Sequence, residues 1–471
     1  MRMASRSFAN LLVGTFFLAA VGVVLWWITD TSITWMHPEI FGAERHYLNN
    51  EQLYWRDVWR FFDCNVLSDE CHRTRFLSYL LGFLNHYFRG AVAGIMPPHP
   101  SLSLTWPLSF AGAYFFWRLL RNLTDNASAA LIGTGLYVVS PGFLSGLVLL
   151  FNPAKPLASF FVTFTLWLAS EIGRKDARQG HLAAALCAAV FLAYCSDETA
   201  WFLYGAIPLL FPGVILRRDR RALAFGFLAT FPLFLAFVTW VVPEAAEYFW
   251  RHRNFDFWGW TFNIGRSSVP TEMSLLERFA PGNLWVNAAT MANSQFGIAG
   301  LALCGALAIA AFFAADAKQR LLLARSVVVL SAFTVFQSLL LLRQANSVSN
   351  VLSGTFYYGA LFSVFSLIVV TISIGTLMGR KWALLPTVAA SAYMAIVSGT
   401  SFHDFNARWI AIHNDIYAEQ IGDSFGRLDK DAALTWARIE RYWSARGDAS
   451  RLHAMRGEFA PKDAWLFIEV K

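Results

Sequence analysis

The stretch FANLLVGTFFLAAVGVVLWWIT, residues 8–29, decides the fold class of this chain. It contains no charged side chain, and it is longer than the roughly 18–20 apolar residues that a helix needs to cross a bilayer. The whole chain is 56% hydrophobic and 15% charged, whereas soluble domains carry about 25% charged residues. Because lipid offers no partners to backbone polar groups, helices are the natural spanning element. The sequence therefore predicts an all-α polytopic membrane protein.

Hydropathy predicts about eleven spans within residues 1–400, and we interpret these residues as the transmembrane domain. The net charge of +7 forms no basic stripe on a soluble module, so the lipid bilayer is an expected partner and nucleic acid is not. The predicted spans are Phe8–Thr29, Leu102–Leu120, Ala127–Leu150, Leu157–Ile172, Leu182–Ser196, Ala200–Leu216, Ala222–Val242, Gln295–Ala315, Leu322–Leu342, Leu352–Met378 and Trp382–Thr400.

Short basic loops predict the orientation, because such loops stay in the cytoplasm. With eleven spans, every basic cluster falls on one side, which places the N-terminus in the cytoplasm and the C-terminus outside. The first span lacks a small-residue cleavage site and is interpreted as an uncleaved anchor. The clusters are Arg2 and Arg6, Arg118 and Arg121, Arg174 to Arg178, Arg217 to Arg221, Lys318 to Arg325, and Arg380 with Lys381.

Three regions are then external: loops 30–101 and 243–294, and the C-terminal region 401–471. The apolar stretch Arg75–Met96 contains several polar residues, and it is either an amphipathic interfacial helix, which the charge pattern favours, or a true crossing. Cys64 and Cys71 in the first loop form a disulfide in an oxidising compartment or stay as free thiols.

The segment Asn49–Phe62, NNEQLYWRDVWRFF, holds the candidate catalytic residues. A carboxylate at the membrane surface, Glu51 or Asp57, can act as a general base while arginines hold an anionic substrate. Tyr54 lies on the same helical face as Glu51, and Arg60 follows closely. The alternative is an amphipathic surface helix with ordinary charge pairs.

This loop resembles the first external loop of the GT-C superfamily of membrane glycosyltransferases. The family pattern Asp-Glu-x-x-Tyr-x-x-x-x-Arg is similar to Asn50-Glu51-Gln52-Leu53-Tyr54 followed by Trp59 and Arg60, with Asn50 in place of the family's aspartate. The resemblance implies a polyprenyl-phosphate-linked sugar donor, transfer on the external face, and a glycan, lipid or protein acceptor. With Asn50 present, either Glu51 or Asp57 carries the catalytic role, or the match is accidental, or activity has been lost.

Asp197 and Glu198 are adjacent carboxylates between two short apolar stretches. Carboxylates at this depth need a partner or a solvated cavity. The resemblance implies contacts to an acceptor or to a divalent metal, Mg²⁺ or Mn²⁺, which the mechanism does not require. The alternative is a solvated hairpin tip with a helix cap.

Further basic residues are candidates for donor-phosphate binding. Each also has a structural interpretation as a snorkelling or boundary side chain. These candidates are Arg75 at the start of the interfacial helix, Lys155 between two prolines, Arg251, His252 and Arg253 in an aromatic loop, and Arg343 at the outer end of a span.

The sequence thus predicts a glycosyltransferase, transferring a hexose or a pentose, in the inner membrane of a bacterium. Three alternatives remain: an envelope polysaccharide polymerase, a lipid-linked sugar transporter or flippase, and a non-catalytic protein of the same architecture. The spans are nearly free of charge, whereas transporters usually carry charged residues within their spans.

Overall fold

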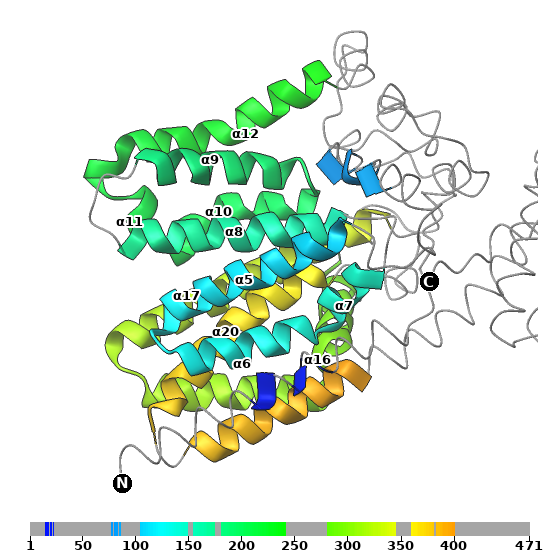
Figure 1. Ribbon diagram of the computed structural model, residues 1–471, viewed down its shortest axis with the longest axis vertical. Helices are drawn as coiled ribbons and strands as arrows, with labels where there is room; N and C mark the ends of the chain where they lie inside the picture. Colours follow the sequence, from blue (N-terminus) through cyan, green and yellow to red (C-terminus); the bar gives the residue numbers. More distant parts are fainter. Residues whose placement is uncertain are drawn as a thin grey trace, which may run out of the picture.

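The computed structural model describes residues 104–148, 154–174, 180–241, 280–344, 359–380 and 383–400, together with helical residues 15–17, 19–20, 22, 77–78, 80–82 and 84–85. Throughout this part the secondary structure is helical, and the long helices lie side by side in a bundle (Figure 1). The helices are α5 Thr105–Thr124, α6 Ala127–Val138, α7 Pro141–Val148, α8 Ala154–Arg174, α9 Gly180–Tyr194, η4 Glu198–Phe202, α10 Leu203–Leu210, α11 Pro212–Ile215, η5 Arg218–Arg220, α12 Arg221–Val241, α16 Pro281–Ala314, α17 Ala317–Gln344 and α20 Ala360–Met378.

Four of these helices are long and apolar enough to cross a membrane: α8, α16, α17 and α20. The pair α6 and α7 makes a fifth candidate if it is one span bent by 56°. Shorter apolar helices cover Gly180–Tyr194, Arg221–Phe237 and Leu384–Thr400. The described part of the chain is therefore all-helical, and its four or five candidate spans indicate an integral membrane protein.

Prolines and a glycine explain why helices and predicted spans differ. The predicted span Ala200–Leu216 is divided into η4, α10 and α11, and the break between α10 and α11 falls where Pro212 begins α11. Helix α16 begins at Pro281, well before the predicted start at Gln295, and it contains a kink at Gly297. Hydropathy finds apolar runs but does not detect such breaks.

Helix α20 is the centre of the bundle. It packs against α5, α6, α7, α8, α16 and α17, and most of its residues are buried. Small residues permit this close packing. A Cβ on Gly142 of α7 would lie 2.6 Å from the Cα of Ala360, and a Cβ on Gly375 would lie 3.0 Å from the Cβ of Thr124.

Two helix breaks meet at Gln295. Its side-chain Oε1 accepts from the N–H of Gly142 at 2.9 Å and from the hydroxyl of Ser363 at 2.7 Å, and its carbonyl accepts from Ser398 at 2.9 Å. Gly297, two residues on, has φ 65°, a region that suits glycine. In lipid, backbone groups freed by a break need internal partners, and Gln295 supplies one for the first turn of α7.

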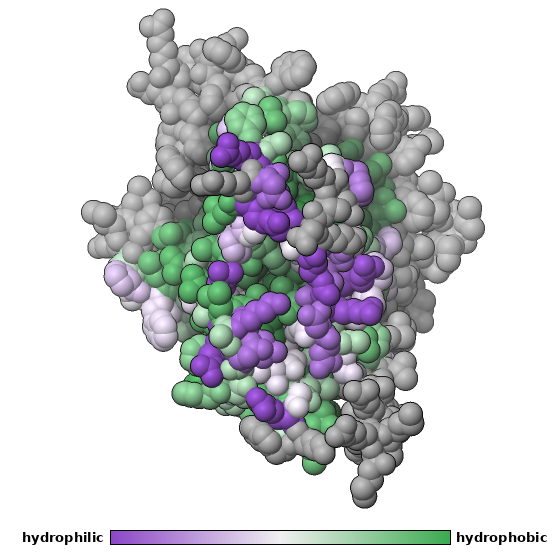
Figure 2. Space-filling view, turned by 90° about the vertical axis from the view of Figure 1, so that its left-hand side faces the viewer, coloured by the Kyte–Doolittle hydropathy of each residue, from purple (hydrophilic) through white to green (hydrophobic). Residues whose placement is uncertain are grey.

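The basic helix ends lie together at one end of the bundle, on the left of Figure 1. Arg174 at the end of α8 donates to the carbonyl of Asn122 in α5 at 2.9 Å. Arg380, after α20, donates to the carbonyl of Ala314 at the end of α16 at 3.0 Å. Figure 2 looks at this end, where hydrophilic surface gathers among hydrophobic helices. We call it the basic end.

Candidate functional site

A buried ion pair lies at the opposite end of the bundle. Lys155 stands in the first turn of α8, and Asp197 stands in the turn between α9 and η4. The Nζ of Lys155 is 2.6 Å from Oδ1 of Asp197, and the two residues are 1% and 0% exposed. A lysine near a helix N-terminus meets the positive end of the helix dipole. The carboxylate of Asp197 offsets both this repulsion and the burial of the ammonium.

The local sequence Ser196-Asp197-Glu198-Thr199 explains why the turn forms. Asp197 has extended backbone angles and caps η4, because its Oδ1 accepts from the backbone N–H of Thr199 at 2.9 Å. The hydroxyl of Thr199 also donates to Oδ1, and Lys155 Nζ lies 3.3 Å from the same hydroxyl oxygen. Asp is among the preferred N-cap residues. One carboxylate oxygen thus joins a helix cap to an interhelical ion pair.

Glu198, the first residue of η4, is 1% exposed. Within the described residues, no group of three or more His, Cys, Asp or Glu side chains is placed to hold a metal ion. At Oδ1 of Asp197 the donor set does not fit a divalent cation, because a positively charged ammonium already lies at 2.6 Å. The geometry provides Asp197 with a counter-ion built into the chain.

Aromatic rings enclose this turn and keep its surroundings apolar. Trp201 of η4 packs edge-on against Phe231 and Phe234 of α12, and its Nε1 donates to the carbonyl of Tyr194 at 3.3 Å. Phe202 packs against Phe333 of α17 at a ring distance of 5.3 Å. In such surroundings an ion pair interacts more strongly, and loss of one partner costs more.

The described helical residues between 77 and 85 lie along this same end. The N–H of Leu77 donates to the carbonyl of Cys195 at 3.1 Å, and the hydroxyl of Ser78 donates to the carbonyl of Ser196 at 2.6 Å. At the other end of this stretch, Asn85 Oδ1 accepts from the N–H of Leu104 at 2.8 Å, beside the start of α5. The stretch therefore joins the end of α9 to the start of α5.

The structure brings together three of the predicted site residues, namely Lys155, Asp197 and Glu198. Arg343 belongs to the last turn of α17, and its side chain is not among those that the structure describes. The remaining candidates lie outside the described residues, as do Cys64 and Cys71: Glu51, Tyr54, Asp57, Arg60, Arg75, Arg251, His252 and Arg253.

The Lys155–Asp197 pair is absent from the sequence interpretation, which gives the two residues separate roles. The sequence does contain a signal for this pairing, because charged groups at membrane depth usually pair with one another. The spacing Asp197-Glu198-Thr199 is likewise typical of a helix cap. Gln295 carries no comparable signal, because its three partners come from distant parts of the chain.

Comparison with known proteins gives no family assignment: no family model matches the chain, and no curated protein matches it.

Proposed function

We propose that the protein is a membrane glycosyltransferase. It moves a sugar from a polyprenyl-phosphate donor to a glycan, lipid or protein acceptor of the cell envelope. One observation carries the proposal: the first loop, which bears Glu51 and Asp57, is hydrogen-bonded through Leu77 and Ser78 to the turn that carries Asp197 and Glu198. Residues 77 and 78 of the first loop and two candidate acids, Asp197 and Glu198, therefore lie at one end of the bundle.

The proposed topology has eleven spans, a cytoplasmic N-terminus and an external C-terminal region. It is supported by the gathering of basic helix ends at one end of the bundle, away from the Lys155–Asp197 pair. Since basic segments stay in the cytoplasm, the end with the ion pair then faces the outside. In this proposal the polyprenyl-phosphate donor is used on that side of the membrane.

The proposed reaction is a displacement at the anomeric carbon of the donor sugar. The carboxylate of Glu51 or Asp57 takes a proton from an acceptor hydroxyl or amine. The acceptor atom forms a bond to the anomeric carbon while the bond to the phosphate oxygen breaks, and the electron pair leaves with the polyprenyl phosphate. Arginines of the external loops, Arg60, Arg75, Arg251 and Arg253 among them, stabilise the departing negative charge.

Within this proposal Lys155 holds the acidic turn in place and does not bind the donor phosphate, because its ammonium is buried against Asp197. Glu198 is buried to the same degree, at 1% exposed, so neither residue is assigned a contact with donor or acceptor. No step is assigned to a metal ion.

The test is a transfer assay with purified protein and a radiolabelled polyprenyl-phosphate sugar. The wild-type protein is expected to transfer label to an envelope acceptor fraction, and Glu51→Gln or Asp57→Asn is expected to lower the rate by about 100-fold or more. Full activity in both variants contradicts the residue assignment. If the wild-type protein neither transfers nor binds any such donor, the proposal is wrong.

A transporter of lipid-linked sugar is the second candidate, and the helix breaks favour it. Discontinuous helices that meet at a polar residue mark the substrate sites of many transporters. Here the α6–α7 bend and the Gly297 kink meet at Gln295. A vesicle assay that measures movement of a lipid-linked sugar between leaflets, without any change in its covalent structure, separates the two functions.

A further inference from the structure

The outward face of α5 ends in two arginines and two amphipathic aromatic residues. Tyr114, Trp117, Arg118 and Arg121 recur at the spacing that places side chains on one helical face. Tyr114 is 50% exposed and Arg121 is also exposed, whereas Phe116, Leu119 and Leu120 on the opposite face are buried. Arg118 and Arg121 lie in the half of α5 that reaches the basic end, and Tyr114 lies near the middle of the helix.

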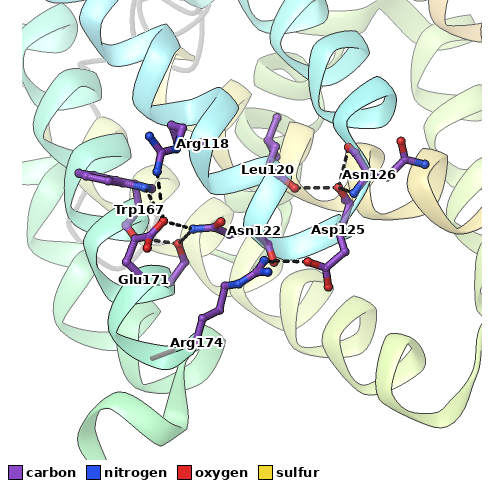
Figure 3. Close-up of polar contacts among 10 residues, drawn as sticks. Arg118, Leu120, Asn122, Asp125, Asn126, Trp167, Glu171 and Arg174 are labelled. Carbon is purple, nitrogen blue, oxygen red and sulfur yellow. Dashed lines mark hydrogen bonds and ion pairs between the residues drawn. The ribbon is translucent and has the colours of Figure 1, made fainter. Parts of the chain in front are cut away.

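Arg118 is held in a defined position between α5 and α8 (Figure 3). Its guanidinium lies over the ring of Trp167, 5.4 Å from the centroid, and donates to the hydroxyl of Tyr114 at 3.1 Å. The carboxylate of Glu171 lies 3.5 Å from a second nitrogen of Arg118, and it also accepts from Asn122 at 2.9 Å and from Trp167 at 3.2 Å. A guanidinium has five N–H donors, so most of those on Arg118 remain for another acceptor.

The acids of this region are both balanced by arginines. Glu171 faces Arg118, and Asp125 lies 2.8 Å from Arg174. Arg174 also covers the carbonyl of Asn122 at the end of α5, so that carbonyl does not repel an approaching anion. Within the described residues no carboxylate lies within ion-pair distance of Arg121, whose guanidinium is 5.7 Å from the ring of Trp117. A positive charge is left over beside an aromatic surface.

That aromatic surface continues along α5 and α8. Phe115 stacks on Trp167 at 5.0 Å, and Phe160 stacks on Phe164 with an interplanar angle of 6°. Phe110 is 40% exposed on the same face of α5. A cationic group at the headgroup level with a flat apolar surface next to it matches an amphiphile with an anionic head and a hydrocarbon tail.

We propose that this face binds an anionic glycerophospholipid of the leaflet at the basic end. Its phosphate contacts Arg121 and the remaining N–H groups of Arg118, and one acyl chain lies along Phe110 and Tyr114. The site is at the opposite end of the bundle from Lys155 and Asp197, so it is independent of the proposed transfer reaction.

The test is native mass spectrometry of the full-length protein, titrated with phosphatidylglycerol or with phosphatidylcholine of the same chains. Arg121→Gln is expected to weaken phosphatidylglycerol binding about fivefold, the effect of one basic residue near an anionic headgroup. The matched control is Arg320→Gln, another exposed arginine at the basic end but on α17, which is expected to change binding less than twofold. Arg118→Gln with Arg121→Gln is expected to remove the preference for phosphatidylglycerol.

Soluble glycerol phosphate is expected not to displace the bound lipid, because it lacks the chain that the aromatic surface holds. The proposal is overturned if phosphatidylcholine binds as tightly as phosphatidylglycerol to the wild-type protein, or if Arg121→Gln and Arg320→Gln have equal effects. Circular dichroism melting of each variant shows whether the fold is retained, and Arg121→Gln alone decides the outcome if the double variant does not fold.

Discussion

Asp197 performs two structural tasks with one carboxylate oxygen, since it caps η4 and neutralises Lys155. The two tasks can be separated by substitution. Asparagine keeps the side-chain oxygen that accepts from Thr199, and it is as good an N-cap as aspartate. It lacks the negative charge. Substitution at this position therefore tests the ion pair without removal of the cap.

We predict that Asp197→Asn destabilises the protein by about 3–5 kcal/mol, because it leaves a buried ammonium without its counter-ion. The measurement is unfolding of the purified protein in mild detergent, followed by circular dichroism. The control is Lys155→Met with Asp197→Asn, which removes both charges, keeps the cap and should recover most of the lost stability. A single variant as stable as the wild-type protein would show that the pair contributes little.

The sequence supports part of this residue-scale picture. Asp197, Glu198 and Lys155 stand out as charged residues at the edges of apolar runs, and membrane energetics predicts that such groups need partners. It does not predict which partner each residue takes. Lys155 and Asp197 are separated by the rest of α8 and by α9, and their pairing depends on how these helices pack.

At the scale of helices, close approach of small residues determines how the breaks fit together. Gly142 opens α7 directly against the start of α20. The sequence run 127–150 predicts one continuous span, whereas the chain bends by 56° between α6 and α7. Local hydropathy is similar on both sides of the bend, but Pro141 begins α7 and marks the break in the sequence. Packing against Ala360 and the hydrogen bond to Gln295 accommodate the bend.

We predict that Gly142→Ala destabilises the bundle by about 1–3 kcal/mol, since its methyl group would meet the backbone of Ala360 and force the helices apart. The matched control is Gly305→Ala in α16, where an added Cβ meets nothing within 4 Å and the higher helix propensity of alanine is expected to be neutral or slightly stabilising. Equal thermal stability of the two variants would argue against the close contact between α7 and α20.

The attachment of the helical residues between 77 and 85, which we call the first-loop helix, to the α9–η4 turn can be tested by cross-linking. The N–H of Leu77 lies 3.1 Å from the carbonyl of Cys195, and Cys195 is a free cysteine. We predict that Leu77→Cys forms a disulfide with Cys195 under mild oxidation, because a hydrogen bond holds the two backbones next to each other.

The disulfide is detected by mass spectrometry of proteolytic fragments. Tyr114→Cys on the outward face of α5 is the control and should give no bond to Cys195, because it points away from the bundle. If Leu77→Cys pairs no more readily than Tyr114→Cys, the loop does not sit on this turn.

At the scale of the whole molecule, the bundle has two chemically different ends. One carries the basic helix ends, and the other carries the buried Lys155–Asp197 pair with the helical residues between 77 and 85. The short basic loops of the sequence predict this polarity well, since each cluster in the described part lies next to a helix end. The total of eleven spans depends on residues outside the description, and it stays a prediction.

The sidedness of the two ends tests the central claim most directly. Single cysteines are placed at Gly282, in the exposed first turn of α16, and at Lys318, in the exposed first turn of α17, in a protein whose native cysteines are replaced. We predict that a membrane-impermeant maleimide labels Gly282→Cys in intact cells and labels Lys318→Cys only after permeabilisation. Labelling of Lys318→Cys from outside, with Gly282→Cys protected, would place the ion pair and the first-loop helix in the cytoplasm and contradict the account.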